Sequence, residues 1–185
     1  DSVSGWNQAR SLEVIFNGVS PANGGIIVDA PEPPGNRSID AGTDLIIGNI
    51  QGNNALMGGV GDDSIIGGSV EDLLIGGLGS DTLIGGDGAD RFAYLQGEGS
   101  AIDIDSINDL TTADRIVVRA QENAFVSGSA SHAGGLWTLT ANFTSSDGVS
   151  TTTESFMLEL QNGATLALDA AASSEQSLVF TAVGL

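Results

Sequence analysis

The sequence contains no cysteine, no lysine and few aromatic residues. Without cysteine, disulfide bonds and thiol chemistry are excluded, so a small domain of this kind needs an apolar core or a bound metal for stability. No apolar run approaches the about 20 residues of a membrane-spanning helix, so we expect no membrane span. The chain begins at Asp1 without a signal region, and we therefore expect a processed or excised product.

Positive charge is also scarce. The chain has 24 acidic residues and five basic residues, all of them arginine, and its formal net charge is −19. Neutralising phosphates requires a basic patch, so we expect no nucleic-acid partner. Fourteen of the 24 acids lie between Asp40 and Asp114, which directs attention to this part of the chain.

This acidic region repeats with a period of nine residues. The repeats are GGVGDDSII (58–66), GGSVEDLLI (67–75), GGLGSDTLI (76–84) and GGDGADRFA (85–93), preceded by the degenerate unit NIQGNNALM (49–57). A short fixed period is typical of a solenoid. A glycine-rich flexible linker would not place an apolar residue at every eighth position, so we reject that interpretation.

The repeat predicts a short strand and a glycine turn in each unit. The eighth residue points into the core, while the seventh and ninth point outward. Two units make one coil, so alternate turns stack on alternate edges, with Asn54, Asp72 and Asp90 on one edge and Asp63 and Asp81 on the other. The candidate metal ligands are these five sixth-position residues and the turn glycines Gly59, Gly61, Gly68, Gly77, Gly79, Gly86 and Gly88. Val70 replaces a turn glycine, so we expect its turn to be the least regular.

Stacked carboxylates require a cation. At a separation of about 5 Å and an effective dielectric constant of about 20, two of them repel by about 3 kcal/mol. Ca²⁺ accepts six to eight oxygen ligands in flexible geometry, whereas Mg²⁺ requires a tighter octahedron and Zn²⁺ prefers nitrogen and sulfur. We therefore predict several calcium ions. Asp44 lies ten residues before Asn54 instead of nine. One extra residue near Ile50 or Gln51 accounts for this difference, and it lets Asp44 join the array beside Asp63.

These units resemble the RTX family of exported bacterial proteins, whose defining repeat is this nonapeptide. The segments Asp90–Tyr94, Asp105–Leu110 and Ala113–Ile116 resemble the region that closes the β-roll in serralysin-type proteases and alginate epimerase R-modules. The resemblance implies that Asp105 and Asp109, with Asp103 as a further candidate, complete the last calcium sites. It also implies type I secretion, with the machinery reading an uncleaved C-terminal signal, and folding on extracellular calcium.

The fold class that follows is all-β, with a parallel β-roll between two flanking β regions. Residues 1–39 form an N-terminal β cap with strands at 11–16 and 25–28, residues 40–118 form the roll and its closing strands, and residues 119–185 form an antiparallel region and the secretion signal. Strands are expected at 136–143 and 152–160 with a hairpin at Asp147–Gly148, and a short helix is a candidate at 169–176.

The ninth position of the repeats is unusually apolar, with Met57, Ile66, Ile75 and Ile84, and Leu73 joins them from a seventh position. Two explanations stay open, because the terminal segments could cover these outward stripes or the stripes could be surfaces for self-association.

No catalytic motif is present, and His132 lies in a polar segment that we interpret as a loop. The acid pairs Asp62–Asp63 and Glu71–Asp72 could suggest acid–base chemistry, but their recurrence favours calcium binding, so we expect no enzyme. We predict a secreted structural protein that assembles on the cell surface or in the matrix. The alternative is the C-terminal secretion module of a larger protease, lipase or epimerase. Candidate partners besides calcium and the secretion machinery are further copies of the chain or a surface polysaccharide, and the latter predicts a basic or aromatic groove.

Overall fold

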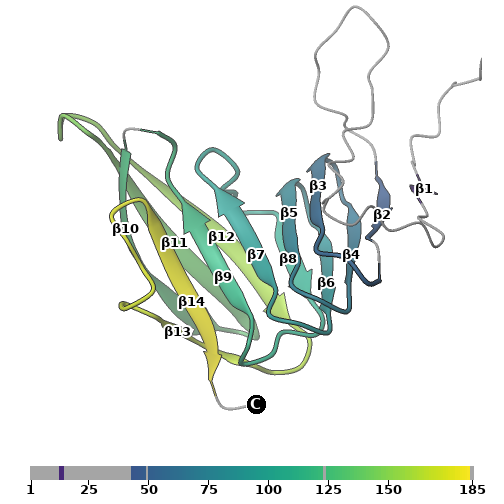
Figure 1. Ribbon diagram of the computed structural model, residues 1–185. Coiled ribbons are helices and arrows are strands. Elements are labelled where there is room, and N and C mark those ends of the chain that lie inside the picture. The colour runs from purple at the N-terminus through teal and green to yellow at the C-terminus, as the bar shows by residue number, and fades with distance from the viewer. Residues whose placement is uncertain (1–12, 15–42, 49, 123, 184–185) are drawn as a thin grey trace, which may run out of the picture.

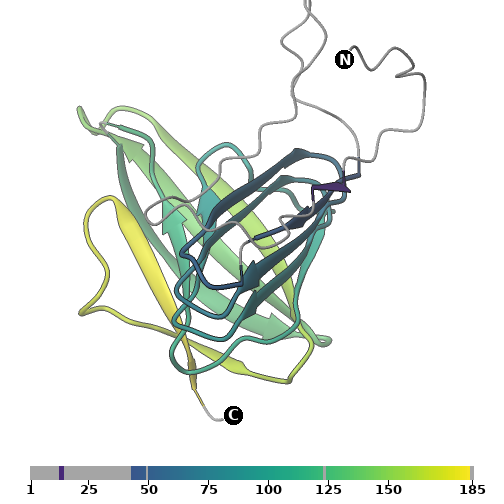
Figure 2. The ribbon, with the colours of Figure 1, turned by 45° about the vertical axis from the view of Figure 1, so that its right-hand side comes forward.

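The computed structural model describes Glu13–Val14 and residues 43–183 except 49 and 123. It contains two β-sheets that face each other, as Figures 1 and 2 show. The eight-stranded sheet has the order β1-β2-β4-β6-β8-β12-β11-β10, and the six-stranded sheet has the order β13-β14-β9-β7-β5-β3. The strands are β1 (Glu13–Val14), β2 (Leu45–Ile47), β3 (Ala55–Val60), β4 (Ser64–Gly68), β5 (Leu73–Leu78), β6 (Thr82–Gly86), β7 (Arg91–Leu95), β8 (Ile104–Ile107), β9 (Arg115–Arg119), β10 (Ala124–Ala133), β11 (Leu136–Ser145), β12 (Thr151–Leu160), β13 (Thr165–Leu168) and β14 (Ser177–Val183).

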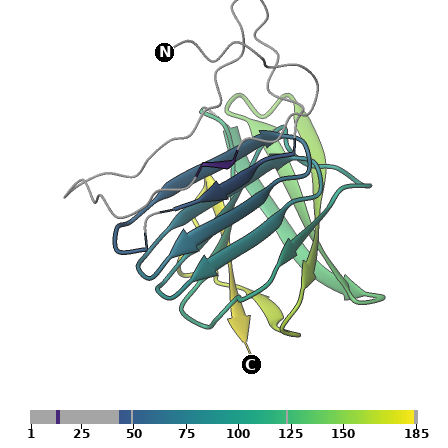
Figure 3. The ribbon, with the colours of Figure 1, turned by 90° about the vertical axis from the view of Figure 1, so that its right-hand side faces the viewer.

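The repeats form a parallel β-roll in which successive strands alternate between the two sheets. Strand β3 pairs with β5 and β4 pairs with β6, both with a register of 18 residues, so two nonapeptides make one coil as predicted. The coils and their turns are stacked along the roll in Figure 3. Strand β2 pairs with β4 at a register of 19 residues. The register changes from 19 to 18 residues between Gly48 and Ile50. The Gly48 amide still bonds to the Ile66 carbonyl in the 19-residue register, whereas the Ile50 carbonyl accepts from the Ser69 amide in the 18-residue register.

The eighth position builds the core of the roll. In the six-stranded sheet, one buried column contains Leu56, Leu74, Phe92, Ile116 and Phe180, all at most 1% exposed. In the eight-stranded sheet, the matching column contains Ile46, Ile65, Leu83, Ile107 and Leu160. Each such side chain contributes about 1.5–3 kcal/mol when it is removed from water. The predicted direction of the eighth side chain is therefore correct.

The C-terminal half continues both sheets of the roll. Strand β12 pairs in parallel with β8, and β14 pairs antiparallel with β9. One apolar core therefore includes residues on both sides of the boundary drawn between residues 118 and 119. Trp137, Leu139, Ala141 and Phe143 alternate inward along β11, as its sequence pattern predicts. The turn between β11 and β12 contains Asp147 and Gly148, where Gly148 has a φ of +70°.

Two local predictions are wrong. Residues 169–176 form turns and not a helix, because the Asp169 carboxylate accepts hydrogen bonds from the Ala171 and Ala172 amides and closes a single turn. His132 lies in strand β10 and not in a loop. Its ring stacks on the ring of Trp137, with the ring centroids 4.9 Å apart. The part of the chain that the structure describes contains no helix long and apolar enough to cross a membrane.

The N-terminal cap lies mostly outside the described residues, including the predicted strand at 25–28. Its described part is strand β1, which falls within the predicted strand at 11–16. This strand pairs in parallel with β2 and so extends the eight-stranded sheet at the first coil. The roll therefore gains a pairing partner for β2 from the N-terminal segment.

Candidate metal centre

Two ladders of aspartate side chains, one of which begins with an asparagine, run along the two edges of the roll. The first ladder contains Asp44, Asp63, Asp81 and Asp105, and the second contains Asn54, Asp72, Asp90 and Asp114. In each ladder, the backbone amide of one member donates to Oδ1 of the member on the next coil, at 2.7–2.9 Å. All eight side chains are buried. The alternation of edges derived from the nine-residue period is thus present in the structure.

The last rung of each ladder spans a longer segment. Asp81 and Asp105 are 24 residues apart, and so are Asp90 and Asp114. Asp105 is therefore the last member of the first ladder. Asp109 lies next to the array but outside both ladders, because its two oxygens accept hydrogen bonds from the Gly85 and Gly86 amides.

The second carboxylate oxygens point to the space beside the first glycine of each unit. A Cβ on Gly67, Gly76 or Gly85 would overlap Oδ2 of the aspartate five residues later. Among the described residues, Oδ2 of Asp72, Asp81 and Asp90 is buried and accepts no hydrogen bond. Burying such a group without a partner costs about 1–3 kcal/mol or more, so these oxygens require a ligand.

Backbone oxygens face the same spaces. A Cβ on Gly67 would also overlap the carbonyl oxygen of Gly85, and a Cβ on Gly58 would overlap that of Gly76. Carboxylate and carbonyl oxygens without nitrogen or sulfur are the donor set that Ca²⁺ prefers. No three acidic or histidine side chains of the described residues come close enough to hold a metal alone, so the backbone oxygens are needed. The residues present therefore fit calcium.

The remaining turn glycines give the turns their shape. Gly59, Gly61, Gly77, Gly79, Gly86 and Gly88 have φ between +96° and +136°. A side chain at Gly77 would be strained and would also overlap the carbonyl of Gly59 on the preceding coil. Gly68, in the unit with Val70, lacks a positive φ. The turn at 67–72 thus departs from the other three, as predicted.

The buried carboxylates have raised pKa values. Burial raises the pKa of Asp81 to about 7, and the charges of Asp105 and Asp62 act in the same direction. Burial likewise raises the pKa of Asp90 and of Asp105 to about 6, and it raises that of Asp72 against the hydrogen bond from the Asn54 amide. In the absence of a cation, the ionised ladders are therefore destabilised in the folded state.

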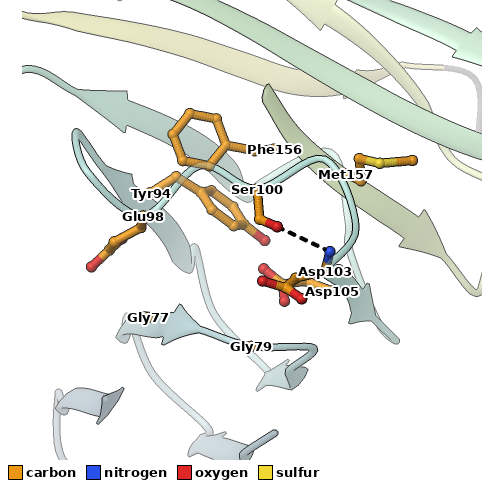
Figure 4. A pocket seen from close by; sticks show the side chains of 9 residues that line it. All are labelled: Gly77, Gly79, Tyr94, Glu98, Ser100, Asp103, Asp105, Phe156 and Met157. Atoms are coloured by element: carbon orange, nitrogen blue, oxygen red, sulfur yellow. Dashed lines mark hydrogen bonds between the residues drawn. The ribbon is translucent and has the colours of Figure 1, made fainter. Parts of the chain in front are cut away.

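The two ladders end differently. Oδ2 of Asp114 accepts hydrogen bonds from the Thr111 amide and hydroxyl, so the protein itself satisfies this carboxylate. At the end of the other ladder, the buried Tyr94 hydroxyl points toward Asp105, as Figure 4 shows. Burial and then the charge of Asp105 raise the pKa of Tyr94 well above its usual value.

Two sets of site residues were not among the candidates. Asp114 was missed, although it lies nine residues after Asp105 and precedes Arg115 and Ile116 as Asp90 precedes Arg91 and Phe92. The first glycines of the units, Gly58, Gly67, Gly76 and Gly85, were missed as well. The glycine pair of each unit was the feature that could have indicated them. In three of the units only the second glycine of the pair has a positive φ, so the first glycine must be present for another reason.

Comparison with known families agrees with this geometry. The family described as the RTX calcium-binding nonapeptide repeat (4 copies) matches residues 50–83 and 67–99. These residues include both glycine-rich edges of the roll and the ladder members from Asn54 to Asp90. A search of curated proteins finds no match.

Proposed function

Because the chain is an RTX repeat protein with a calcium-binding β-roll, we propose that it is a non-catalytic structural component outside the cell that assembles with copies of itself. The repeats indicate calcium binding and association with type I secretion. In our proposal, extracellular calcium neutralises the two ladders, and the folded roll then presents a contact surface. The residues that would hold the ions are the ladder carboxylates and the carbonyl oxygens of the first glycines.

The observation that carries this proposal is an apolar line across the outer face of the six-stranded sheet. Outward residues alternate with the core residues on β3, β5, β7, β9 and β14. The line consists of Met57, Ile75, Ala93, Val117 and Val179. Met57 is 41% exposed, and Ile75 and Val117 are partly exposed. The C-terminal strands extend the sheet sideways, as Figure 1 shows, and within the line Ala93 and Val179 are buried, at 5% and 7% exposed.

The outer face of the eight-stranded sheet differs. Its apolar row, Ile47, Ile66 and Ile84, is confined to the roll strands β2, β4 and β6. Beside Ile84, the next residue along the sheet is Asn108, and the outward pairs on β8 and β12 are Ile104 with Met157 and Ser106 with Glu159. The ninth-position row of this sheet thus ends at a polar residue, whereas that of the six-stranded sheet continues into β9 and β14, and this favours the six-stranded sheet as the contact surface.

Charge also distinguishes the six-stranded sheet. Arg91, Arg115 and Arg119, the arginines of the described part of the chain, project from its outer face on β7 and β9. The exposed acids Asp62, Glu71 and Asp87 lie instead on the turns at the edges of the roll. Two arginine-bearing faces would repel each other, whereas this face attracts an acidic edge of the next copy. Such a head-to-tail contact generates rings or filaments.

The test is the assembly state of the full chain in millimolar calcium, measured by sedimentation velocity and electron microscopy. We expect Ile75→Glu to abolish assembly, because it places a charge in the centre of the apolar line. The matched control is Ile84→Glu, which changes another ninth-position isoleucine on the opposite sheet and should leave assembly intact. Dispersed wild-type monomers at high protein and calcium concentrations would contradict the proposal.

A further inference from the structure

Strand β10 is the longest edge strand of the two sheets in the described part of the chain. It ends the eight-stranded sheet on the side farthest from the repeats (Figure 1). The other edge strands, β1, β3 and β13, have two, six and four residues, whereas β10 has ten. Its ladder with β11 is continuous, so no bulge interrupts the strand. An edge of this kind presents unpaired N–H and C=O groups to another chain.

The accessible part of this edge begins after Val126. The Val126 amide points away from β11 and donates to the Glu175 carbonyl at 2.8 Å, so the following loop covers the start of the strand. Because backbone groups alternate in direction along a strand, the amides and carbonyls of Gly128, Ala130 and His132 also point away from β11. These groups have no hydrogen-bond partner among the described residues. Three consecutive bonding positions are therefore available to a further strand.

The side chains along this edge are small, exposed and uncharged. Ser129 and Ser131 are exposed on the outer face, and the ring of His132 stacks on Trp137 of β11 and so lies away from the edge. Residues 124–146 contain no aspartate, glutamate, arginine or lysine, although the chain has a formal net charge of −19. Edge strands that avoid pairing usually carry lysine, proline or an inward charge, and β10 has none of them. Two copies of this acidic chain can therefore approach each other at β10 with little repulsion.

A second copy of the chain fits this edge better than an unrelated peptide. An added peptide gains specificity from pockets for its alternate side chains, and Gly128 and Ala130 offer such side chains little to contact. A two-fold antiparallel pairing centred on Ala130 instead places Gly128 opposite His132 of the second copy, so the unpaired groups of each copy meet those of the other. Ser129 then lies opposite Ser131 of the second copy, and facing hydroxyls of this kind stabilise a strand pair.

We propose that β10 pairs antiparallel with β10 of a second copy, centred on Ala130, and joins two eight-stranded sheets into one continuous sheet. This contact goes beyond the head-to-tail contact proposed above, because it uses the edge of one sheet and not the outer face of the other. A single strand pair is a small interface, so isolated copies pair only transiently. Copies repeated along an assembly add their pairings together, so the edge links neighbouring assemblies side by side.

Disulfide cross-linking of the full chain in calcium tests the register, because the chain has no cysteine of its own. The proteins carrying Ser129→Cys and Ser131→Cys are mixed and oxidised gently. In the proposed pair these two positions face each other with Cα atoms about 4.5 Å apart, whereas the two thiols of either variant alone lie on a diagonal of about 7–8 Å, at the limit of disulfide reach. The control is a mixture of Thr153→Cys and Ser155→Cys, which have the same spacing on the outer face of β12.

We expect the β10 mixture to form cross-linked heterodimers roughly tenfold faster than either variant alone forms homodimers, and the β12 mixture to form few. The double variant Ser129→Lys/Ser131→Lys places lysine opposite lysine, so its assemblies should be single in electron micrographs, with calcium-induced β structure retained. Thr138→Lys/Thr140→Lys adds the same charges one strand from the edge and should leave them joined.

Equal cross-linking in the β10 mixture and in the separate variants, or none at high protein concentration, would overturn the inference. Cross-linked heterodimers without any larger assembly of the wild-type chain would support the β10 contact and overturn the proposed function instead.

Discussion

At the residue scale, each ladder aspartate has two separate tasks. Its Oδ1 accepts the amide of the preceding ladder member, which is a structural contact that needs no cation. Its Oδ2 points to a space that only glycine leaves open, and for Asp72, Asp81 and Asp90 this oxygen lacks a partner within the protein. The same side chain therefore stabilises the coil through one oxygen and requires an ion through the other.

This division predicts opposite effects of one substitution with and without calcium. In Asp90→Asn, the amide oxygen can still accept from Asp72, but the charge is lost. Burial raises the pKa of Asp90 to about 6, so the ionised carboxylate opposes folding when no cation is present. We expect higher stability than the wild type in metal-free buffer, and roughly tenfold weaker calcium binding. The β content of the metal-free chain by circular dichroism measures the first effect, and urea unfolding at increasing calcium concentrations measures the second.

Asp87→Asn is the control for this experiment, because Asp87 lies in the same turn but is exposed. It should leave the metal-free β content unchanged and should change the free energy of unfolding in calcium by no more than about 0.5 kcal/mol. Equal destabilisation by Asp90→Asn in both buffers would mean that the carboxylate acts only as a hydrogen-bond acceptor.

At the scale of the element, the ladder behaves as a stack of coupled acids. The folded-state pKa values of Asp81, Asp90 and Asp105 are about 7, 6 and 6, above the usual aspartate value of 3.8. Without metal, the folded state thus holds more protons than the unfolded state between about pH 4 and pH 7. The stability contributed by these protons is complete below pH 4 and is lost as the pH rises through 6 to 7.

We therefore expect the metal-free chain to become more stable when the pH is lowered from 8 to 5. The measurement is the β content of the metal-free chain by circular dichroism as a function of pH, in buffers stripped of metal by resin, because soluble chelators weaken at low pH. In saturating calcium, the order should reverse, since protons then compete with the ion for the same oxygens. A metal-free β content that falls on acidification would contradict the raised pKa values.

The sequence was most informative about the elements that repeat. The eighth-position residues, such as Leu74 and Leu83, specify both the strand and its buried side, and the sixth positions specify the edge of each turn. Asp114 could have been found from its spacing of nine residues after Asp105. The pairing of β12 with β8 could not, because it joins segments about 50 residues apart and no short-range period encodes it.

Residues 169–176 illustrate how a local contact overrides composition. The alanines there favour a helix, but the carboxylate of Asp169 accepts from the two following alanine amides. Ser173 Oγ then accepts from the Val179 amide and directs the chain into β14. Side-chain hydrogen bonds of this kind depend on the neighbouring strand, which the sequence of the segment alone does not reveal.

At the scale of the whole molecule, the roll and the C-terminal half share two sheets and one core. Phe180 of β14 is fully buried and stands in the same column as Leu56, Leu74 and Phe92 of the repeats. Metal binding and C-terminal packing should consequently stabilise one cooperative unit.

Phe180→Ala tests this coupling. Removing a fully buried phenylalanine costs about 3–5 kcal/mol. If the column is continuous, the loss should also raise the calcium concentration needed to fold the repeats, although Phe180 lies far along the chain from them. Phe125→Ala is the control, because Phe125 is 42% exposed and its loss should cost much less. An unchanged calcium midpoint in Phe180→Ala would mean that the two halves fold independently.

The most direct test of the central claim is a calcium titration of the full chain followed by far-ultraviolet circular dichroism at neutral pH. Calcium bound only by the folded ladders must contribute its binding free energy to folding. We expect a largely disordered spectrum in chelator and a cooperative gain of β structure in millimolar calcium. The same β spectrum in chelator and in calcium would contradict the claim that the ladders need the ion to fold.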